Sequence, residues 1–305
     1  MNLDDIKDPA DLLSTDADIV KYEFSNFIKV EKFGERRASK QKLKLLKTID
    51  PIIRTITSEE EIVYFVTNGL KVSTFEQLFI GHATNYYNLT AFAFTSDRIL
   101  LFHIKSINAI GTYISRIEYS SIRKVSSSLF GSLKIKLTNG KSLIFSRVPK
   151  KDRVYLRDLL NSVIDANASK DKSAPGIIHI CPSCFGDVLT IPRSCPSCNQ
   201  EFKSPKKAAW LSFLMPGLGD LYLGHKVMGS IELIIMLYIW STFLIAAYEE
   251  AIAGNSLQGP LITLTLLFLI IHPIDALKSY YLGKKGLIPV ETKGKAAQSP
   301  ESIQT

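Results

Sequence analysis

Four cysteines lie close together in the sequence and are suited to bind one metal ion. They form two Cys-Pro-Ser-Cys pairs and are the only cysteines in the chain: Cys181, Cys184, Cys195 and Cys198. Two residues separate the members of each pair, which is the spacing at which a tight turn directs two thiolates at the same ion. A tetrahedral four-thiolate zinc site leaves no position open for a substrate or an activated water. The spacing therefore predicts a structural zinc ion rather than a catalytic one.

Redox exchange and disulfide bonding are the two other uses of such cysteines. A redox Cys-x-x-Cys normally opens a helix in a βαβ unit, whereas these two copies flank residues 185–194, a segment short enough for a hairpin. A secreted, disulfide-bonded chain would need a signal peptide, and this chain begins Met1-Asn-Leu-Asp-Asp. We therefore expect a zinc ribbon over residues 177–204, in a reducing compartment.

The sequence that follows the cysteines is apolar enough to enter a membrane. Residues 205–288 form a predicted membrane domain, in which 227–248 carries Glu232 as its only charge. At about 1.5 Å per residue that segment spans roughly 33 Å, close to the thickness of a hydrocarbon core. A second span is predicted at 260–281, although it includes a proline and ionisable groups. Residues 208–223 are interrupted by a Pro-Gly-Leu-Gly-Asp sequence, so we expect an interfacial or re-entrant segment there.

The lysines around the two spans predict their orientation. They lie outside the connection 249–259, which has none, and flank the other ends of the spans: Lys206, Lys207, Lys226, Lys278, Lys284 and Lys285. Cytoplasmic flanks of membrane helices are enriched in lysine and arginine. We therefore expect a helical hairpin in the inner membrane of a bacterium, with the soluble domains and both termini in the cytoplasm.

A basic segment lies near the start of the chain. Residues 1–50 are predicted to be a flexible N-terminus followed by a basic amphipathic helix, because Leu43, Leu46 and Ile49 recur at helical spacing. Eight basic side chains lie in this helix or just before it, against two acidic ones: Lys29, Lys32, Arg36, Arg37, Lys40, Lys42, Lys44 and Lys47. Such a cluster fits a contact with anionic lipid, and it equally fits a solvated helix face.

Short apolar runs follow, with the alternation that is typical of strands. They are predicted at 62–66, 91–104, 113–117, 133–137 and 143–145. Asn139-Gly140 supplies a tight hairpin turn, and an apolar stripe from Leu156 to Ile164 then predicts a helix. We expect a small antiparallel β-barrel with a C-terminal helix over 51–168, a linker at 169–176 and a disordered tail at 289–305. The fold class is therefore multidomain: barrel, zinc ribbon and transmembrane hairpin.

Residues 57–168 resemble the bacterial pleckstrin-homology-like (PH-like) domains. The resemblance rests on Glu59-Glu60-Glu61, on 93–101 with its Thr-Ser-Asp-Arg sequence, on Ile117-Glu-Tyr-Ser-Ser-Ile122, and on the hairpin and final helix. It implies a scaffold that docks protein or lipid, with no catalytic residues. Phosphoinositide binding would need a basic pocket in the early loops, and 67–82 offers only Lys71.

Residues 207–281 resemble a small two-helix transmembrane family. The matching features are Gly217-Leu-Gly219, Tyr222-Leu-Gly224 and a last helix that ends near Ile274-Asp275. The departures are Pro216 and Leu221, which stand where the family has other residues.

Three ionisable residues in this apolar sequence are candidates for a polar site within the membrane: Asp220, His272 and Asp275. His272 and Asp275 are three residues apart and so share a helix face. The competing interpretation places Asp275 near the cytoplasmic end of its helix, close to Lys278. It places Asp220 and His225 at the interface, where neither is costly.

No motif of an enzyme is present: there is no phosphate-binding glycine loop, nucleophile elbow or His-Glu-x-x-His. The leading hypothesis is a non-enzymatic docking protein, anchored in the membrane, which binds a lipid or protein partner or a second copy of itself. One alternative is an oligomeric membrane enzyme or transporter subunit that uses Asp220, His272 and Asp275. Another alternative is nucleic-acid binding by the ribbon. Residues 181–198 contain Arg193 as their only basic side chain, so we expect no binding of nucleic acid. No small-molecule substrate is indicated.

Overall fold

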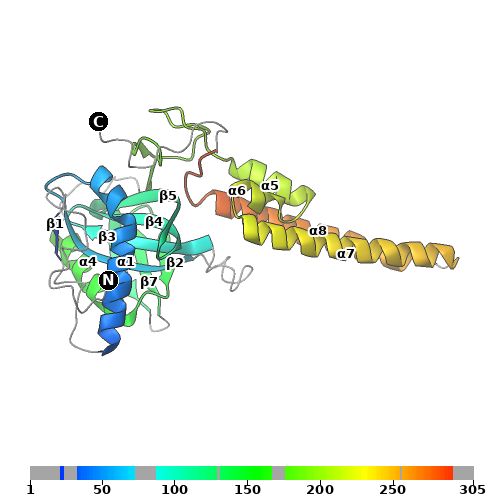
Figure 1. Cartoon of the computed structure of the whole chain (residues 1–305), viewed down its shortest axis with the longest axis horizontal. Coiled ribbons are helices and arrows are strands. Elements are labelled where there is room, and N and C mark those ends of the chain that lie inside the picture. Colours follow the sequence, from blue (N-terminus) through cyan, green and yellow to red (C-terminus); the bar gives the residue numbers. More distant parts are fainter. Residues whose placement is uncertain are drawn as a thin grey trace. The chain divides into compact units, whose positions relative to one another are not determined.

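A computed structural model describes residues 21–23, 33–72, 87–128, 131–166, 176–254 and 256–290 (Figure 1). The chain divides into two compact units, one built on the β-sheet and the other on the apolar helices, and each is described by itself. The predictions for residues 1–20, for most of the linker at 169–176 and for the tail from 291 lie outside the described residues. Pro289 and Val290, which we predicted to begin that tail, instead pair with Phe202 and Glu201.

The first unit contains a ten-stranded, mostly antiparallel sheet. Nine strands run in the order β10-β9-β5-β4-β3-β2-β8-β7-β6, and β1 pairs in parallel with β2. Their bounds are Lys21–Tyr22 (β1), Ile62–Val72 (β2), Leu89–Thr95 (β3), Arg98–Ser106 (β4), Ala109–Glu118 (β5), Ile122–Ser127 (β6), Leu133–Leu137 (β7), Ser142–Ser146 (β8), Ile178–Ile180 (β9) and Asp187–Val188 (β10). Alternation is cleanest in β7, where Leu133, Ile135 and Leu137 are buried and the two lysines between them are exposed.

The sheet is open, so the predicted closed barrel is not observed. Among the strands that the structure describes, β6 pairs only with β7, and β5 takes β9 as its second partner. A 3₁₀ turn at Tyr119–Ser121 separates β5 from β6 and leads the chain away from the β5 edge. The predicted run 91–104 is two strands, because the chain turns at Ser96-Asp97.

Two helices contribute apolar side chains to the core of this sheet. Helix α1 (Phe33–Ile56) buries Leu46, Ile49 and Ile53, which confirms the amphipathic helix. It runs through Pro51, so the domain boundary predicted at 50/51 falls inside one helix. Proline has no backbone N–H, so the helix carbonyl four residues before Pro51 lacks its usual donor. Pro51 is exposed, and water can hydrogen-bond to that carbonyl instead. Helix α4 (Lys150–Ala166) buries Leu156 and Leu160. Its Asp152 joins three elements by accepting from Lys42 of α1 and Thr67 of β2.

The Thr-Ser-Asp-Arg sequence forms a polar contact that holds the β3–β4 turn. Glu61, whose side chain is fully buried, accepts from Arg98 Nε at 3.0 Å and Nη2 at 2.6 Å, and from the Thr95 hydroxyl. Tyr119 donates to the Thr95 carbonyl at 2.6 Å. Burial raises the pKa of Glu61, but the hydrogen bonds from Arg98 and Thr95 outweigh it and leave that pKa below 4.5. The motif residues thus act in structure, by fixing the turn.

The substitution Glu61→Gln is expected to destabilise the sheet by about 3 kcal/mol, since it leaves Arg98 without its charged partner. Because the folded pKa of Glu61 is lowered, its contribution is present above pH 4.5 and is lost as the pH falls through the folded value. Hydrogen exchange of β3 and β4 in the full chain measures the loss of stability. The difference in exchange between the wild type and Glu61→Gln should become smaller as the pH falls. The exposed neighbour provides the control, Glu60→Gln, which should be neutral at every pH; equal effects of the two variants would contradict this account.

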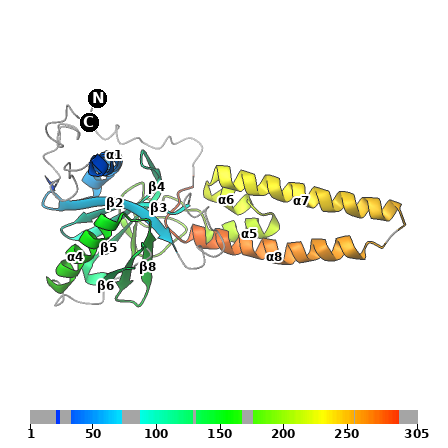
Figure 2. The same ribbon diagram turned by 90° about the horizontal axis from the view of Figure 1, so that it is seen from below.

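The second unit is helical. Helices α7 (Lys226–Ile252) and α8 (Gln258–Gly283) run antiparallel side by side, as Figure 2 shows. Helices α5 (Pro205–Leu214) and α6 (Leu218–Leu223) pack against them. Two separate helices at 205–223 agree with the predicted interruption of this segment. Helices α7 and α8 are long and apolar enough to cross a membrane. In the most apolar 18-residue stretch of each helix, only 6% and 11% of the residues are buried.

Two glycines of the second unit, Gly217 and Gly219, stand where only a residue without a side chain fits. Gly217 adopts φ +90°, and a Cβ there would lie 2.5 Å from the Gly229 carbonyl oxygen. A Cβ on Gly219 would lie 2.3 Å from the Ala208 carbonyl oxygen and from Ser212 Oγ. Real Cβ atoms do not approach other atoms so closely, so these positions allow α5, α6 and α7 to pack backbone against backbone.

Candidate metal centre

The two cysteine pairs form two knuckles with the same backbone geometry. In the first, Phe185 N donates to Cys181 O at 2.9 Å and Cys181 N donates to Gly186 O at 2.9 Å. In the second, Asn199 N donates to Cys195 O at 3.0 Å and Cys195 N donates to Gln200 O at 2.9 Å. The fifth residue of each knuckle has a positive φ, 55° for Phe185 and 59° for Asn199. The repeated turn directs both cysteines of a pair to one point, as metal-binding knuckles require.

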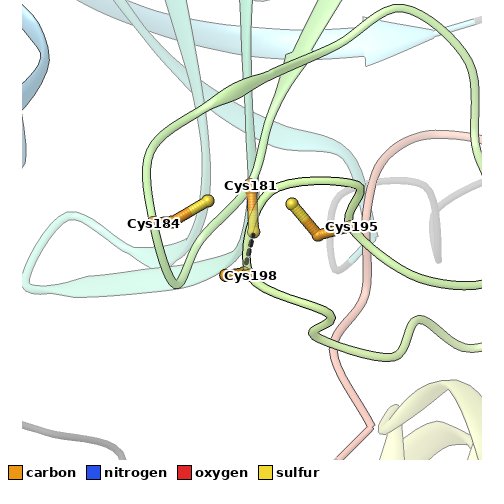
Figure 3. A group of neighbouring side chains, drawn as sticks. All are labelled: Cys181, Cys184, Cys195 and Cys198. Carbon is orange, nitrogen blue, oxygen red and sulfur yellow. Dashed lines mark hydrogen bonds between the residues drawn. The ribbon is translucent and has the colours of Figure 1, made fainter.

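The four thiols converge, as Figure 3 shows, and could hold one metal ion. Their sulfur atoms lie within 4.8 Å of one another, and Cys181 Sγ is 3.7 Å from Cys198 Sγ. A tetrahedron of sulfurs at about 2.3 Å from zinc has edges of about 3.8 Å, whereas a disulfide would need about 2.05 Å. All four cysteines are free thiols. The donor set therefore fits a four-thiolate zinc ion.

The geometry does not suit a redox pair. Each knuckle is a turn, and the nearest regular element to Cys181 is strand β9, so neither pair opens a helix. Cys181 and Cys195 are buried, while Cys184 and Cys198 are exposed. A metal ion bound to all four would be closed to substrates.

Strand β9 holds the first knuckle on the sheet. It pairs with β5, with Ile180 opposite Ile114 and His179 opposite Ser115, and Ile180 is part of the hydrophobic core. The predicted linker at 169–176 is thus followed by a strand that belongs to the sheet, and the predicted ribbon at 177–204 begins with a sheet strand. His179 shares a 3.1 Å hydrogen bond with Ser115, and burial, with a smaller contribution from Lys71, lowers its pKa to about 4.

A second cluster joins ionisable side chains of the helical unit. Lys278 Nζ of α8 lies 2.8 Å from Asp220 of α6, 2.5 Å from Glu232 of α7 and 2.6 Å from Asp275 of its own helix. Asp275 also accepts from the Gly217 amide at 3.0 Å. The structure thus brings together two of the three residues predicted for a polar site in the membrane, Asp220 and Asp275. Glu232, the only charge in the predicted span 227–248, also belongs to this cluster and was not predicted as a member.

The third predicted member, His272, has a different neighbourhood. Its Nδ1 is 2.7 Å from the Phe213 carbonyl oxygen, and its ring packs against Phe268 and Trp240. It is not among the groups that contact Lys278. His272 therefore acts as a packed aromatic contact between α5 and α8.

The basic residues predicted to contact lipid are distributed over different environments. Lys40, Lys44 and Lys47 are exposed on α1. Lys42 instead points inward, pairs with Asp152 at 2.8 Å and lies over the Phe65 ring. Arg36 and Arg37 are in α1 but their side chains are not described, and Lys29 and Lys32 lie outside the described residues.

Comparisons with known proteins do not assign the chain to a family. No protein-family model matches it, and no curated protein matches it. One similar solved structure is the crystal structure of the C-terminal domain of an unknown protein from Leishmania infantum. It is 15% identical, the match covers 39% of this chain and 94% of that chain, and the TM-score is 0.25.

Proposed function

We propose that this protein is a non-enzymatic docking protein anchored in a membrane, whose sheet and zinc ribbon bind a lipid or protein partner at the inner surface of the bilayer. The observation that carries the proposal is the exposed apolar surface of α7 and α8, which includes Ile234 at 66% and Leu269 at 61%. A helix in the core of a soluble protein would bury such residues. About 27 residues of helix measure about 40 Å, enough to cross the hydrocarbon core.

The lysines at one end of the helix pair support an orientation in which both ends of the hairpin lie in the cytoplasm. Lys226 begins α7, while Lys284 and Lys285 follow α8 at the same end of the antiparallel pair. The opposite connection between α7 and α8 contains no lysine or arginine. Lys207 and Lys284 lie over the rings of Tyr222 and Tyr280, at 5.2 and 4.5 Å from the ring centroids. Tyrosines and lysines together are typical of the cytoplasmic interface.

A docking role is also supported by how the polar groups are used. Four thiolates would close the zinc ion to substrates, so that the ion, when bound, supplies a cross-link between two turns. Asp220, Glu232 and Asp275 all contact Lys278, so these four charged groups pair with one another. The ion cluster therefore favours a structural anchor over a transport site.

The PH-like assignment is the finer part of this proposal. Its support is the arrangement of a four-strand meander, β2 to β5, and a three-strand meander, β6 to β8, joined by β2–β8 pairing and followed by helix α4. This is the order of elements on which the resemblance in the sequence rests.

Membrane fractionation of the full chain tests the proposal. We expect the protein to stay with membranes in alkaline carbonate, and a protease added to the cytoplasmic face of inverted vesicles to cleave the sheet unit. The substitution Ile234→Arg should weaken carbonate resistance, because a charge in the middle of a span is costly, by about 3 kcal/mol. The matched control is Val154→Arg on the exposed side of α4, which should change nothing. Release of the wild-type chain by carbonate, or protection of the sheet unit from the protease, would contradict the proposal.

A further inference from the structure

The outer face of β6, β7 and β8 carries a cluster of lysines that the strand register creates. Lys134 and Lys136 alternate with buried residues along β7, so both face away from the core. Lys124 of β6 stands directly opposite Lys136, and Ser126 stands opposite Lys134. Ser142 of β8 completes the row beside Lys136. We refer to Lys124, Lys134 and Lys136 as the sheet lysines.

In the part of the chain that the structure describes, no carboxylate pairs with the sheet lysines. The three strands contain no aspartate or glutamate, and the sheet lysines form no ion pair with a carboxylate of the described residues. All three are exposed. Like charges that stand directly opposite each other in antiparallel strands are unfavourable. The Lys124–Lys136 pair therefore works against the stability of the free sheet, and a bound polyanion would remove this cost.

We propose that the sheet lysines bind the anionic headgroups of a lipid bilayer. The inference rests on the proposed function, because the apolar helices α7 and α8 of the same chain would hold the sheet near a bilayer. Lipid phosphates are then the anions at the highest local concentration. The three ammonium groups and the serine hydroxyls beside them present many hydrogen-bond donors on a sheet face that has no pocket. Such a flat array of donors suits a surface with many phosphates better than it suits one small ligand.

The contribution of these lysines should be strong and sensitive to salt. Each lysine near an anionic membrane surface strengthens binding about fivefold, so three together contribute on the order of 100-fold. Screening confines the attraction to about 10 Å at 0.1 M salt and about 3 Å at 1 M.

The test uses the full chain held in neutral phosphatidylcholine nanodiscs. Its affinity is measured for separate vesicles of phosphatidylcholine alone or with phosphatidylglycerol, at low and high salt. We expect binding to the anionic vesicles only, weakened by salt, and weakened on the order of 100-fold in the triple variant Lys124→Gln, Lys134→Gln, Lys136→Gln. A second triple variant changes three exposed lysines of α1, Lys40→Gln, Lys44→Gln, Lys47→Gln, which belong to the other predicted lipid contact. The inference requires this variant to lose less affinity for the anionic vesicles than the sheet variant does.

Lysine acetylation of the wild-type chain provides a second measurement that does not depend on how the variants fold. The sheet lysines should be acetylated more slowly with anionic vesicles than with neutral ones, whereas exposed Lys141 in the adjoining turn reports any general change in reactivity. Unchanged acetylation, an unaffected sheet variant, or loss of binding only in the α1 variant would overturn the inference. Preference for a single-stranded oligonucleotide over anionic vesicles would overturn it as well. If the chain fails to enter nanodiscs, the proposed function fails; if it enters and does not bind anionic vesicles, only this inference fails.

Discussion

Removing the metal from the four-cysteine site is expected to unfold the two knuckles while leaving the centre of the sheet folded. Structural zinc in small ribbons contributes about 10–16 kcal/mol of apparent binding free energy, and that energy is folding energy for the segment it holds. Between Cys181 and Cys198 the described chain has only the two-residue strand β10 as regular structure, so little else holds the turns. In contrast, β3 and β4 bury Phe92, Phe94 and Phe102 in the core of the sheet, to which the first knuckle adds the partly buried Phe185.

Hydrogen exchange of the full chain, with and without a chelator, measures this effect. Amides of residues 181–202 should exchange on the order of 100-fold faster without the metal, and β9 should be affected at its Ile180 end. The substitution Cys198→Ser should have the same effect as the chelator, whereas Ser197→Ala, an exposed neighbour, should have none. Loss of protection throughout β3 and β4 would show that the sheet depends on the metal, and unchanged protection in the knuckles would show that no metal holds them.

The substitution Lys278→Met is expected to destabilise the helical unit by about 3–5 kcal/mol. The carboxylates of Asp220, Glu232 and Asp275 lie within 4.8 Å of one another, and Lys278 is the ammonium that contacts all three. Removing one partner from a buried ionic network leaves uncompensated charges, which is far more costly than losing an exposed ion pair. Two of the three carboxylates belong to α6 and α7, and only Asp275 belongs to the helix of Lys278. The substitution would therefore also remove contacts between α8 and these two helices.

Tryptophan fluorescence in detergent follows this unit separately, because Trp210 and Trp240, in α5 and α7, are the only tryptophans of the chain. The matched control is Lys226→Met, at the exposed start of α7, which should leave the unfolding midpoint unchanged. Adding Asp220→Asn to Lys278→Met should recover part of the loss by removing one carboxylate. Equal effects of Lys226→Met and Lys278→Met, or a second substitution that worsens the first, would argue against a coupled network.

Local patterns in the sequence predicted much of the structure. The spacing of the cysteines predicted the convergence of the thiols, because two residues between ligands is a property of the turn itself. Alternation in 133–137 gave the bounds of β7, and the apolar stripe of Leu46, Ile49 and Ile53 predicted the buried face of α1. Each of these patterns records a single element, whose period is visible along the chain.

Features that depend on pairing between distant segments were not predicted. The partnership of β9 with β5, and of Lys124 with Lys136, depends on strand register, which the periodicity of one strand does not contain. Glu61 was noted in the sequence as part of the PH-like resemblance, but its ion pair with Arg98 was not predicted, because it depends on the pairing that brings the start of β2 close to β4. The network around Lys278 was missed because that lysine was counted as a flanking charge, while its helix packs against α6 and places it among carboxylates.

X-ray absorption at the zinc edge, on the full chain purified without added chelator, tests the central claim most directly. The account predicts one zinc ion per chain with four sulfur neighbours at about 2.3 Å and no oxygen or nitrogen ligand. Such a closed shell would agree with an ion that holds the ribbon together in a docking protein. Three or fewer sulfurs with a water or another light ligand would leave an open coordination position and contradict the structural role, as would a chain whose cysteines are oxidised and hold no metal.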